Sequence, residues 1–170
     1  MSQLIVRPAR VAGELAVPGS KSHTIRAVAL AALAAGESRL RAPLVSADTA
    51  AALAAARSFG ATVTELPDCW QIAGIGGALP EGGVDKIRID VGNSGTTLRL
   101  FTGLAALFSR PFHFDGDASI RQRPMGPLLA ALEQLGVCVS ATNGRCPLTV
   151  QGPIRGGAAT VAGTSSQFVS

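Results

Sequence analysis

The 170-residue chain has no tyrosine, a single tryptophan and only 15% charged residues, and its basic residues form no cluster. Nucleic-acid binding usually requires a basic stripe or aromatic rings on which bases stack, so the net charge of +4 does not indicate a nucleic-acid partner. No apolar run reaches the roughly 18 residues that a membrane helix needs. The first ten residues also lack the pattern of a signal peptide. We therefore expect a soluble, cytoplasmic protein without nucleic-acid or membrane partners.

Metal ligands are scarce as well. The three cysteines lack the CxxC spacing, and the two histidines, His23 and His113, lie far apart in the sequence. A structural zinc site needs four closely spaced ligands of these types, so we expect no metal and no other cofactor. Three cysteines without such a pattern are typical of reduced thiols in the cytosol. The hydrophobic content of 47% is ample for a folded core.

The most informative pattern is an internal repeat. Residues 54–74 and 131–152 both read as a helix end, a glycine, a strand, a turn, a second strand and a glycine. Upstream, two residue pairs share the i, i+4 spacing of one helical face: Ser22 with Arg26, and Gly95 with Arg99. One unit then has the order strand, loop, helix, strand, helix, hairpin.

The first unit, residues 13–75, is expected to contain strands at Glu14–Val17 and Ser38–Arg41, helices at Thr24–Ala35 and from an Asp48 N-cap to Phe59, and a hairpin of Thr62–Glu65 with Trp70–Ala73. The second unit, residues 84–153, is expected to contain strands at Lys86–Val91, Pro111–Phe114, Val137–Ala141 and Leu148–Gln151, with helices at Thr96–Leu107 and from Pro124 to Leu135.

The glycine-rich stretch Gly74–Gly83 is expected to be a linker between the units. Residues 154–170 read as the start of a third unit, with a strand at Gly157–Val161. The sequence therefore predicts an α/β (α+β) fold of repeated βαβαββ units. Because the chain stops inside an expected helix, we expect a truncated product or a piece of a longer protein.

Three helix-entry loops lie about 70 residues apart, at the equivalent place in each unit. They are Gly19–Ser22, Gly92–Thr97 and Gly163–Gln167. A helix start carries unpaired N–H groups and the positive end of the helix dipole, so it attracts phosphate and carboxylate groups. Three such starts in one repeating architecture predict a single site for a multiply anionic ligand.

Basic side chains accompany these loops. Lys21 is one of only two lysines and offers a flexible positive charge, while Arg26 is expected to project back toward its loop. Arg123 stands directly before a proline, where its guanidinium can grip a carboxylate at two points. Arg99 repeats the position of Arg26, and either an internal ion pair or a ligand contact is open for it. The remaining candidates are Ser22 as a helix cap or ligand donor, Gly95 for close backbone approach, and Ser165, Ser166 and Gln167 as hydroxyl and amide donors.

In this order, the motifs resemble the enolpyruvyl transferase family, and most specifically its 5-enolpyruvylshikimate-3-phosphate synthases, the targets of glyphosate. The resemblance rests on Pro18–Ser22 with Arg26, Gly92–Thr96 with Arg99, Asp117, Arg121, Arg123–Met125 and Ser165–Gln167. It covers essentially the whole chain, but only the N-terminal part of the family's length. The chain departs from the family pattern at Thr97 and Leu100, where many members carry alanine and proline.

The resemblance implies a two-domain protein, each domain built of three βαβαββ units around a pseudo-threefold axis, with the ligands between the domains. Residues 1–12, with a strand at about Leu4–Pro8, would belong to the other domain, and residues 13–170 to the substrate-binding domain. The implied reaction transfers the enolpyruvyl group of phosphoenolpyruvate to the 5-hydroxyl of shikimate 3-phosphate and releases phosphate. Lys21, the implied catalytic residue, would contact both substrates. Shikimate 3-phosphate would bind to Ser22, Arg26, Ser165, Ser166 and Gln167, and phosphoenolpyruvate to Gly95, Arg123 and Gln167. The missing C-terminal half would be the partner, and no metal is implied.

Three alternatives differ in what they require. The sister transferase that acts on UDP-N-acetylglucosamine would show Lys-Asn in the first loop and a cysteine before the Arg-Pro pair, but this chain has Lys21-Ser22 and no cysteine in Asp115–Arg123. RNA 3′-phosphate cyclase shares related units, but the sparse basic residues argue against it. An inactive fragment that binds shikimate 3-phosphate weakly is the third alternative for the chain by itself.

Overall fold

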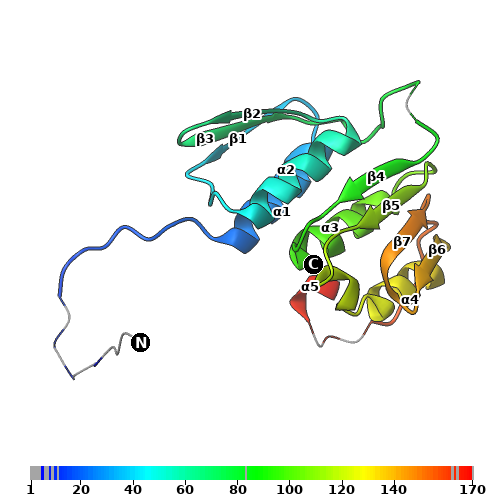
Figure 1. The fold of residues 1–170 in the computed structure, drawn as a ribbon. Helices are drawn as coiled ribbons and strands as arrows, with labels where there is room; N and C mark the ends of the chain where they lie inside the picture. Colours follow the sequence, from blue (N-terminus) through cyan, green and yellow to red (C-terminus); the bar gives the residue numbers. More distant parts are fainter. Residues whose placement is uncertain are drawn as a thin grey trace.

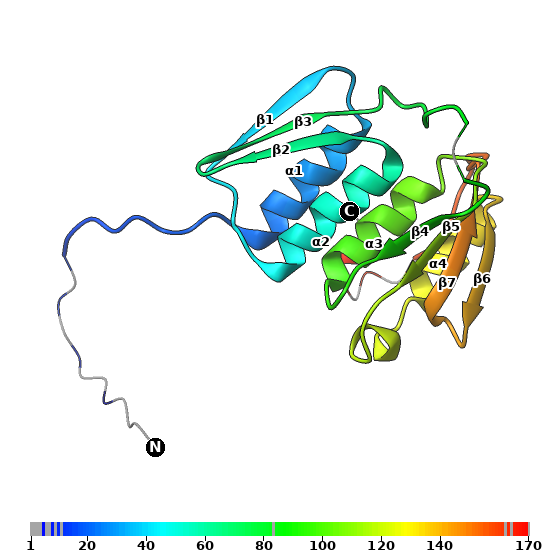
Figure 2. The ribbon, with the colours of Figure 1, turned by 45° about the horizontal axis from the view of Figure 1, so that its top comes forward.

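The computed structural model describes residues 5, 8, 10, 12–82, 84–161, 163 and 165–169. Figures 1 and 2 show two sheets on the outside of the molecule, with the long helices between them. Among the described residues, no helix has the length and apolar character needed to cross a membrane.

The first unit consists of α1 (Lys21–Leu33), β1 (Glu37–Arg41), α2 (Ala47–Phe59), β2 (Thr62–Leu66) and β3 (Cys69–Ala73). The second consists of β4 (Ile87–Asp90), α3 (Gly95–Ala105), β5 (Phe112–Asp115), the 3₁₀ turn η1 (Ile120–Gln122), α4 (Gly126–Gln134), β6 (Cys138–Thr142) and β7 (Arg145–Gln151), and is followed by the four-residue helix α5 (Ser166–Val169). The strand order β1-β3-β2 in the first sheet matches β5-β7-β6 in the second, with both pairs antiparallel in each case. The predicted mixed α/β fold of repeated units is therefore confirmed.

The two units differ at their first strand. In the second unit β4 joins the sheet edge parallel to β5, in register from Ile87 opposite Phe112. The strand predicted at Glu14–Val17 is absent: these residues form no ladder, and Leu15 and Val17 are 85% and 79% exposed. Residues 12–20 run away from the body of the protein, as the blue part of the trace shows in Figure 1. The first sheet therefore has three strands and the second has four.

Three further expectations need correction. Ser46, not Asp48, caps α2, because Ser46 and Thr49 form a reciprocal capping box. Pro124 does not begin α4, which starts at Gly126. The N–H of Met125, the residue before the helix, donates to the carbonyl of Gly144 at 2.9 Å. The residues at 157–161 form no strand. The strand expected at about Leu4–Pro8 falls largely outside the described residues.

The glycines of the repeat have a packing reason. Gly60 ends α2 in the left-handed conformation at φ 106°, which glycine adopts without strain. A Cβ on Gly74 would collide with the carbonyl oxygens of the last turn of α1, and a Cβ on Gly152 would collide with the carbonyl of Ala106 after α3. The same close contact between hairpin and helix therefore recurs in both units.

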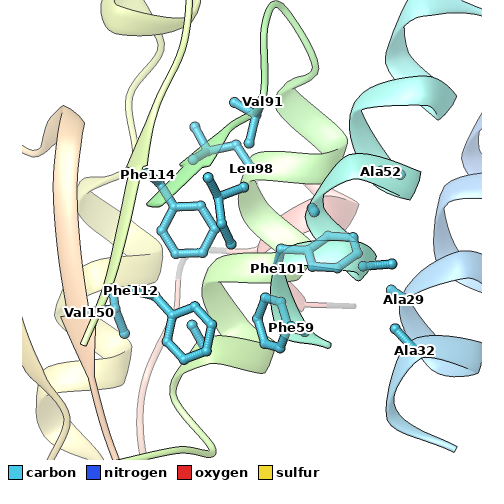
Figure 3. Close-up of a cluster of buried hydrophobic side chains, with 14 of the residues drawn as sticks. Ala29, Ala32, Ala52, Phe59, Val91, Leu98, Phe101, Phe112, Phe114 and Val150 are labelled. Carbon is cyan, nitrogen blue, oxygen red and sulfur yellow. The ribbon is translucent and has the colours of Figure 1, made fainter. Parts of the chain in front are cut away.

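The core joins the two units. Phe59 at the end of α2 stacks on Phe112 of β5, with ring centroids 4.4 Å apart, and meets Phe101 of α3 edge-on at 5.6 Å. Figure 3 shows Phe59 between these two rings, with alanines of α1 and α2 on one side of the cluster. The small alanine side chains let α1, α2 and α3 approach one another closely. This packing brings the starts of α1 and α3 to the same end of the molecule.

Candidate functional site

The three helix-entry loops meet at one polar pocket of about 310 Å³. Its lining comes from five separate segments of the chain: Lys21, Ser22, Asp48, Asn93, Gly95, Thr96, Arg123 and Gln167. Five of the predicted site residues are therefore brought together, namely Lys21, Ser22, Gly95, Arg123 and Gln167. The fold therefore brings together three loops that lie about 70 residues apart in the sequence.

The first loop contributes a lysine that already has a partner. Ser20, rather than Ser22, caps α1, since its hydroxyl oxygen accepts from the N–H of His23 at 3.4 Å. This leaves the Ser22 side chain available to the pocket. The Nζ of Lys21 donates to Oδ2 of Asp48 at 2.5 Å, and the lysine side chain is half exposed. Lys21 thus faces the pocket with a neighbouring carboxylate that an anionic ligand would have to displace or accommodate.

The second loop is shaped around Gly95. Ser94 caps α3, and its hydroxyl lies 2.7 Å from the hydroxyl of Thr97. Gly95 is buried, and a Cβ built on it would lie 2.6 Å from Nη1 of Arg123 and 2.9 Å from Nη1 of Arg99. A side chain at this position would therefore push two guanidinium groups away from the loop. The glycine is required by this close approach.

Arg123 reaches the pocket from the segment between β5 and α4. The carboxylate of Asp117 accepts from the Ile120 N–H at 2.8 Å, and the Asp117 N–H donates to the carbonyl of Gly92 at 3.0 Å. These bonds tie the segment to the second loop. The Nη2 of Arg123 then donates to Oδ1 of Asn93 at 2.7 Å. Arg123 is therefore held beside Gly95 through bonds to neutral oxygen.

Arg121 is directed elsewhere. Its guanidinium binds the carboxylate of Asp115 at two points, 2.9 and 2.7 Å long, and lowers the pKa of that carboxyl. Arg121 thus forms an ion pair with Asp115, and its charge is balanced outside the pocket.

The third loop presents Gln167. Its Nε2 donates to the hydroxyl of Thr96 at 2.9 Å, and its Oε1 accepts from Nη1 of Arg99 at 2.9 Å. Ser165 caps the short helix α5, because its hydroxyl accepts from the Gln167 N–H at 3.3 Å. Ser166 is exposed. These two serines lie next to the pocket without lining it.

Arg26 lies apart from the polar pocket. Its Nη1 donates to the carbonyl of Ser22 at 3.4 Å, and its side chain lines an apolar groove between α1 and α3 together with Leu30 and Leu100. Leu100, one of the two departures from the family pattern, thus faces this groove. Thr97, the other, is fully buried and donates to the carbonyl of Asp48 at 3.3 Å, which links the starts of α3 and α2.

The charge of the site is positive and incompletely paired. Asp48 offsets Lys21, but in the part of the chain that the structure describes neither Arg99 nor Arg123 forms an ion pair with a carboxylate. Burial and, secondarily, the charge of Arg123 lower the pKa of Arg99. Arg99 and Arg123 are like charges held over one glycine and repel each other, and an anion bound to Arg123 in the pocket would partly neutralise Arg123 and weaken that repulsion. The geometry is suited to phosphate or carboxylate groups.

Sequence reasoning left out Asp48, Asn93 and Thr96. Asp48 was assigned as a helix cap, a role that the capping box of Ser46 removes. Asn93 and Thr96 lie within the second loop, and this position was the available signal for them. Over the described residues, no group of three or more histidine, cysteine or acidic side chains is arranged to hold a metal ion.

Comparisons with known proteins agree on one family. The family model described as EPSP synthase (3-phosphoshikimate 1-carboxyvinyltransferase) matches residues 5–170. The 3-phosphoshikimate 1-carboxyvinyltransferase of Acetivibrio thermocellus is 44% identical over 169 residues, which are 98% of this chain and 39% of that protein. The enzyme of the same name from Methanothermobacter thermautotrophicus is 46% identical over 173 residues, covering 100% of this chain and 40% of the relative.

The fold agrees as well. An EPSP synthase structure from Acinetobacter baumannii superposes with a TM-score of 0.81 at 26% identity, over 92% of this chain and 36% of that one. The chain therefore belongs to the EPSP synthase family. It spans about 40% of the length of the curated relatives that it matches.

Proposed function

We propose that this chain forms the first part of the substrate site of an EPSP synthase. The reaction is transfer of the enolpyruvyl group of phosphoenolpyruvate to the 5-hydroxyl of shikimate 3-phosphate, with release of phosphate, in the shikimate pathway to chorismate and the aromatic amino acids. The observation that carries the proposal is the pocket in which all three loops meet beside two guanidinium groups that have no carboxylate partner among the described residues. We also propose that the protein acts in the cytoplasm, as the sequence predicted.

The charges of the pocket suit this chemistry. Both substrates are multiply anionic, so they repel each other, and cationic groups must offset that repulsion to hold them within reacting distance. Lys21 lines the pocket and would contact both substrates. Arg123 and the backbone of Gly95 would hold phosphoenolpyruvate. Ser22 would hold shikimate 3-phosphate, and Gln167 would reach both ligands.

Three of the proposed ligand residues lie outside the pocket. Arg26, Ser165 and Ser166 are proposed as ligands of shikimate 3-phosphate from the family resemblance alone, since they do not line the pocket. The resemblance also places the acid and base groups mainly in the part of the enzyme that this chain does not span. We accordingly propose that residues 13–170 form the substrate-binding domain, that residues 1–12 belong with the partner domain, and that the chain by itself binds without turnover.

Calorimetric titration of shikimate 3-phosphate into the chain tests the proposal. The chain has two lysines, so Lys21→Ala and Lys86→Ala remove the same charge from the pocket and from an exposed site outside it. We expect saturable binding that is lost in Lys21→Ala and kept in Lys86→Ala. An equal loss in both variants would mean that only net charge matters, which contradicts a site at these loops.

A phosphate-release assay with both substrates separates binding from turnover. The chain alone should release no phosphate above background, and mixing it with the remaining part of the enzyme should restore release. Steady turnover by the chain alone would show that the acid and base groups lie within these 170 residues, contrary to the proposal.

A further inference from the structure

Arg99 does not line the pocket, yet its guanidinium lies directly behind it and contacts three separate segments. Nη1 donates to the carbonyl of Gly95 at 3.1 Å and to Oε1 of Gln167 at 2.9 Å. Nη2 donates to the carbonyl of Pro124 at 3.3 Å. The guanidinium carbon also sits 5.1 Å from the ring centroid of Phe168. One side chain thus joins the second loop, the Arg123–Pro124 segment and the third loop.

The acceptors of Arg99 are all neutral. Sequence reasoning left an internal ion pair open for this arginine, but over the described residues no carboxylate pairs with it. Its Nε is buried and has no hydrogen-bond partner there. Burying a guanidinium against neutral oxygens is less favourable than pairing it with a carboxylate, so stability by itself does not explain the arrangement. What this placement provides is a set of directional hydrogen bonds from the planar guanidinium of Arg99.

Gln167 depends on these contacts. Helix α5 has only four residues, none of them fully buried, and the partly buried Phe168 packs against the core. The side-chain amide of Gln167 is held at both ends, by Arg99 at the oxygen and by Thr96 at the nitrogen. Removing the arginine would free the amide to rotate and would leave Phe168 without its cationic neighbour.

We propose that Arg99 is a positioning residue of the site: it fixes the orientation of the Gln167 amide and anchors the third loop against the second. Arg99 acts on the ligand through Gln167 and does not touch it. The effect on substrate affinity rests on the proposed function, whereas the effect on Gln167 does not require a ligand.

The ligand-free test uses the exchange of the Gln167 side-chain amide protons with water, followed by NMR and assigned with Gln167→Ala. Arg99→Met keeps the side-chain length and removes every donor, so amide exchange should become about tenfold faster. Arg99→Lys retains the charge and a single donor nitrogen and should give an intermediate rate, which also covers the case in which Arg99→Met does not fold. Arg145→Met, at an exposed position on β7, is the matched control and should leave the rate unchanged. Unchanged exchange in both Arg99 variants would overturn the proposal.

The binding test is a double-mutant cycle with shikimate 3-phosphate as the probe. Arg99→Met and Gln167→Ala should each weaken binding by about tenfold, and the double variant should bind no more weakly than Gln167→Ala. Losses that multiply in the double variant would show that Arg99 acts independently of Gln167 and would overturn the proposal. If the unmodified chain does not bind the probe, the proposed function fails, and the amide exchange decides the role of Arg99 by itself.

Discussion

Replacing Gly95 by alanine tests the geometry of the site most directly. The added Cβ would stand 2.6 Å from Nη1 of Arg123, so the guanidinium must retreat by roughly 1 Å to reach an ordinary contact distance. That movement strains the 2.7 Å bond to Asn93, which fixes the direction of Arg123. Hydrogen bonds to charged groups contribute about 1.5–3 kcal/mol, so affinity for an anion gripped by Arg123 should fall by about ten- to a hundredfold.

Folding stability should respond in the opposite direction. Gly95 opens α3 and has no positive φ, and alanine is favoured over glycine in helices by up to about 1 kcal/mol. The Gly95→Ala variant should therefore unfold at the same temperature as the unmodified chain or slightly above it. A loss of affinity without a loss of stability identifies a local displacement of the arginines.

The assay is calorimetric titration of phosphoenolpyruvate in the presence of shikimate 3-phosphate, with thermal unfolding measured on the same samples. The control is Gly103→Ala, also in α3, where an added Cβ meets no atom within 4 Å. Gly103→Ala should keep full affinity. The reasoning is refuted if Gly95→Ala binds as well as the unmodified chain, or if Gly103→Ala loses as much affinity.

Three further changes have defined outcomes. Phe59→Ala should destabilise the chain by about 3–5 kcal/mol and shift the urea midpoint accordingly, because this ring joins the two units; a loss below about 1 kcal/mol would contradict that role. Asp48→Asn should strengthen anion binding severalfold, since it releases Lys21 from its ion pair, and weaker binding would show instead that the carboxylate orients the lysine. The pKa of Asp115 is lowered by Arg121, so the stability from this pair is present above the ordinary carboxyl pKa of about 4 and is lost as pH falls through the lower folded value. Asp115→Asn should therefore reduce stability at pH 7, and the difference from the unmodified chain should shrink as the pH is lowered below about 4, as followed by unfolding at each pH.

Much of the fold was readable from local patterns. Helix ends, glycines and hairpins recur in both halves of the sequence with matched spacing, and the strand orders β1-β3-β2 and β5-β7-β6 reproduce that repeat. Two of the errors fell at helix starts. Asp48 and Pro124 are both suitable for the positions assigned to them, but Ser46 and the Met125–Gly144 bond determine where the helices begin. Caps compete over one or two residues, and tertiary contacts decide between them.

The strand expected at Glu14–Val17 shows a different limit. A strand requires a partner edge, and no local pattern in this short segment specifies which edge it meets. In the second unit the equivalent segment finds β5.

The sequence by itself determined the repeated units, the three helix-entry loops and most of the basic and polar groups that carry the site, because helical and strand periods and capping residues act within a few positions. Only the tertiary structure decided which of these groups meet. Lys21 binds Asp48, which is 27 residues away, and Arg99 binds Gln167, which is 68 residues away. Such contacts depend on how α1, α2 and α3 pack around the shared aromatic core, and that packing is set by the shapes of side chains from both units together.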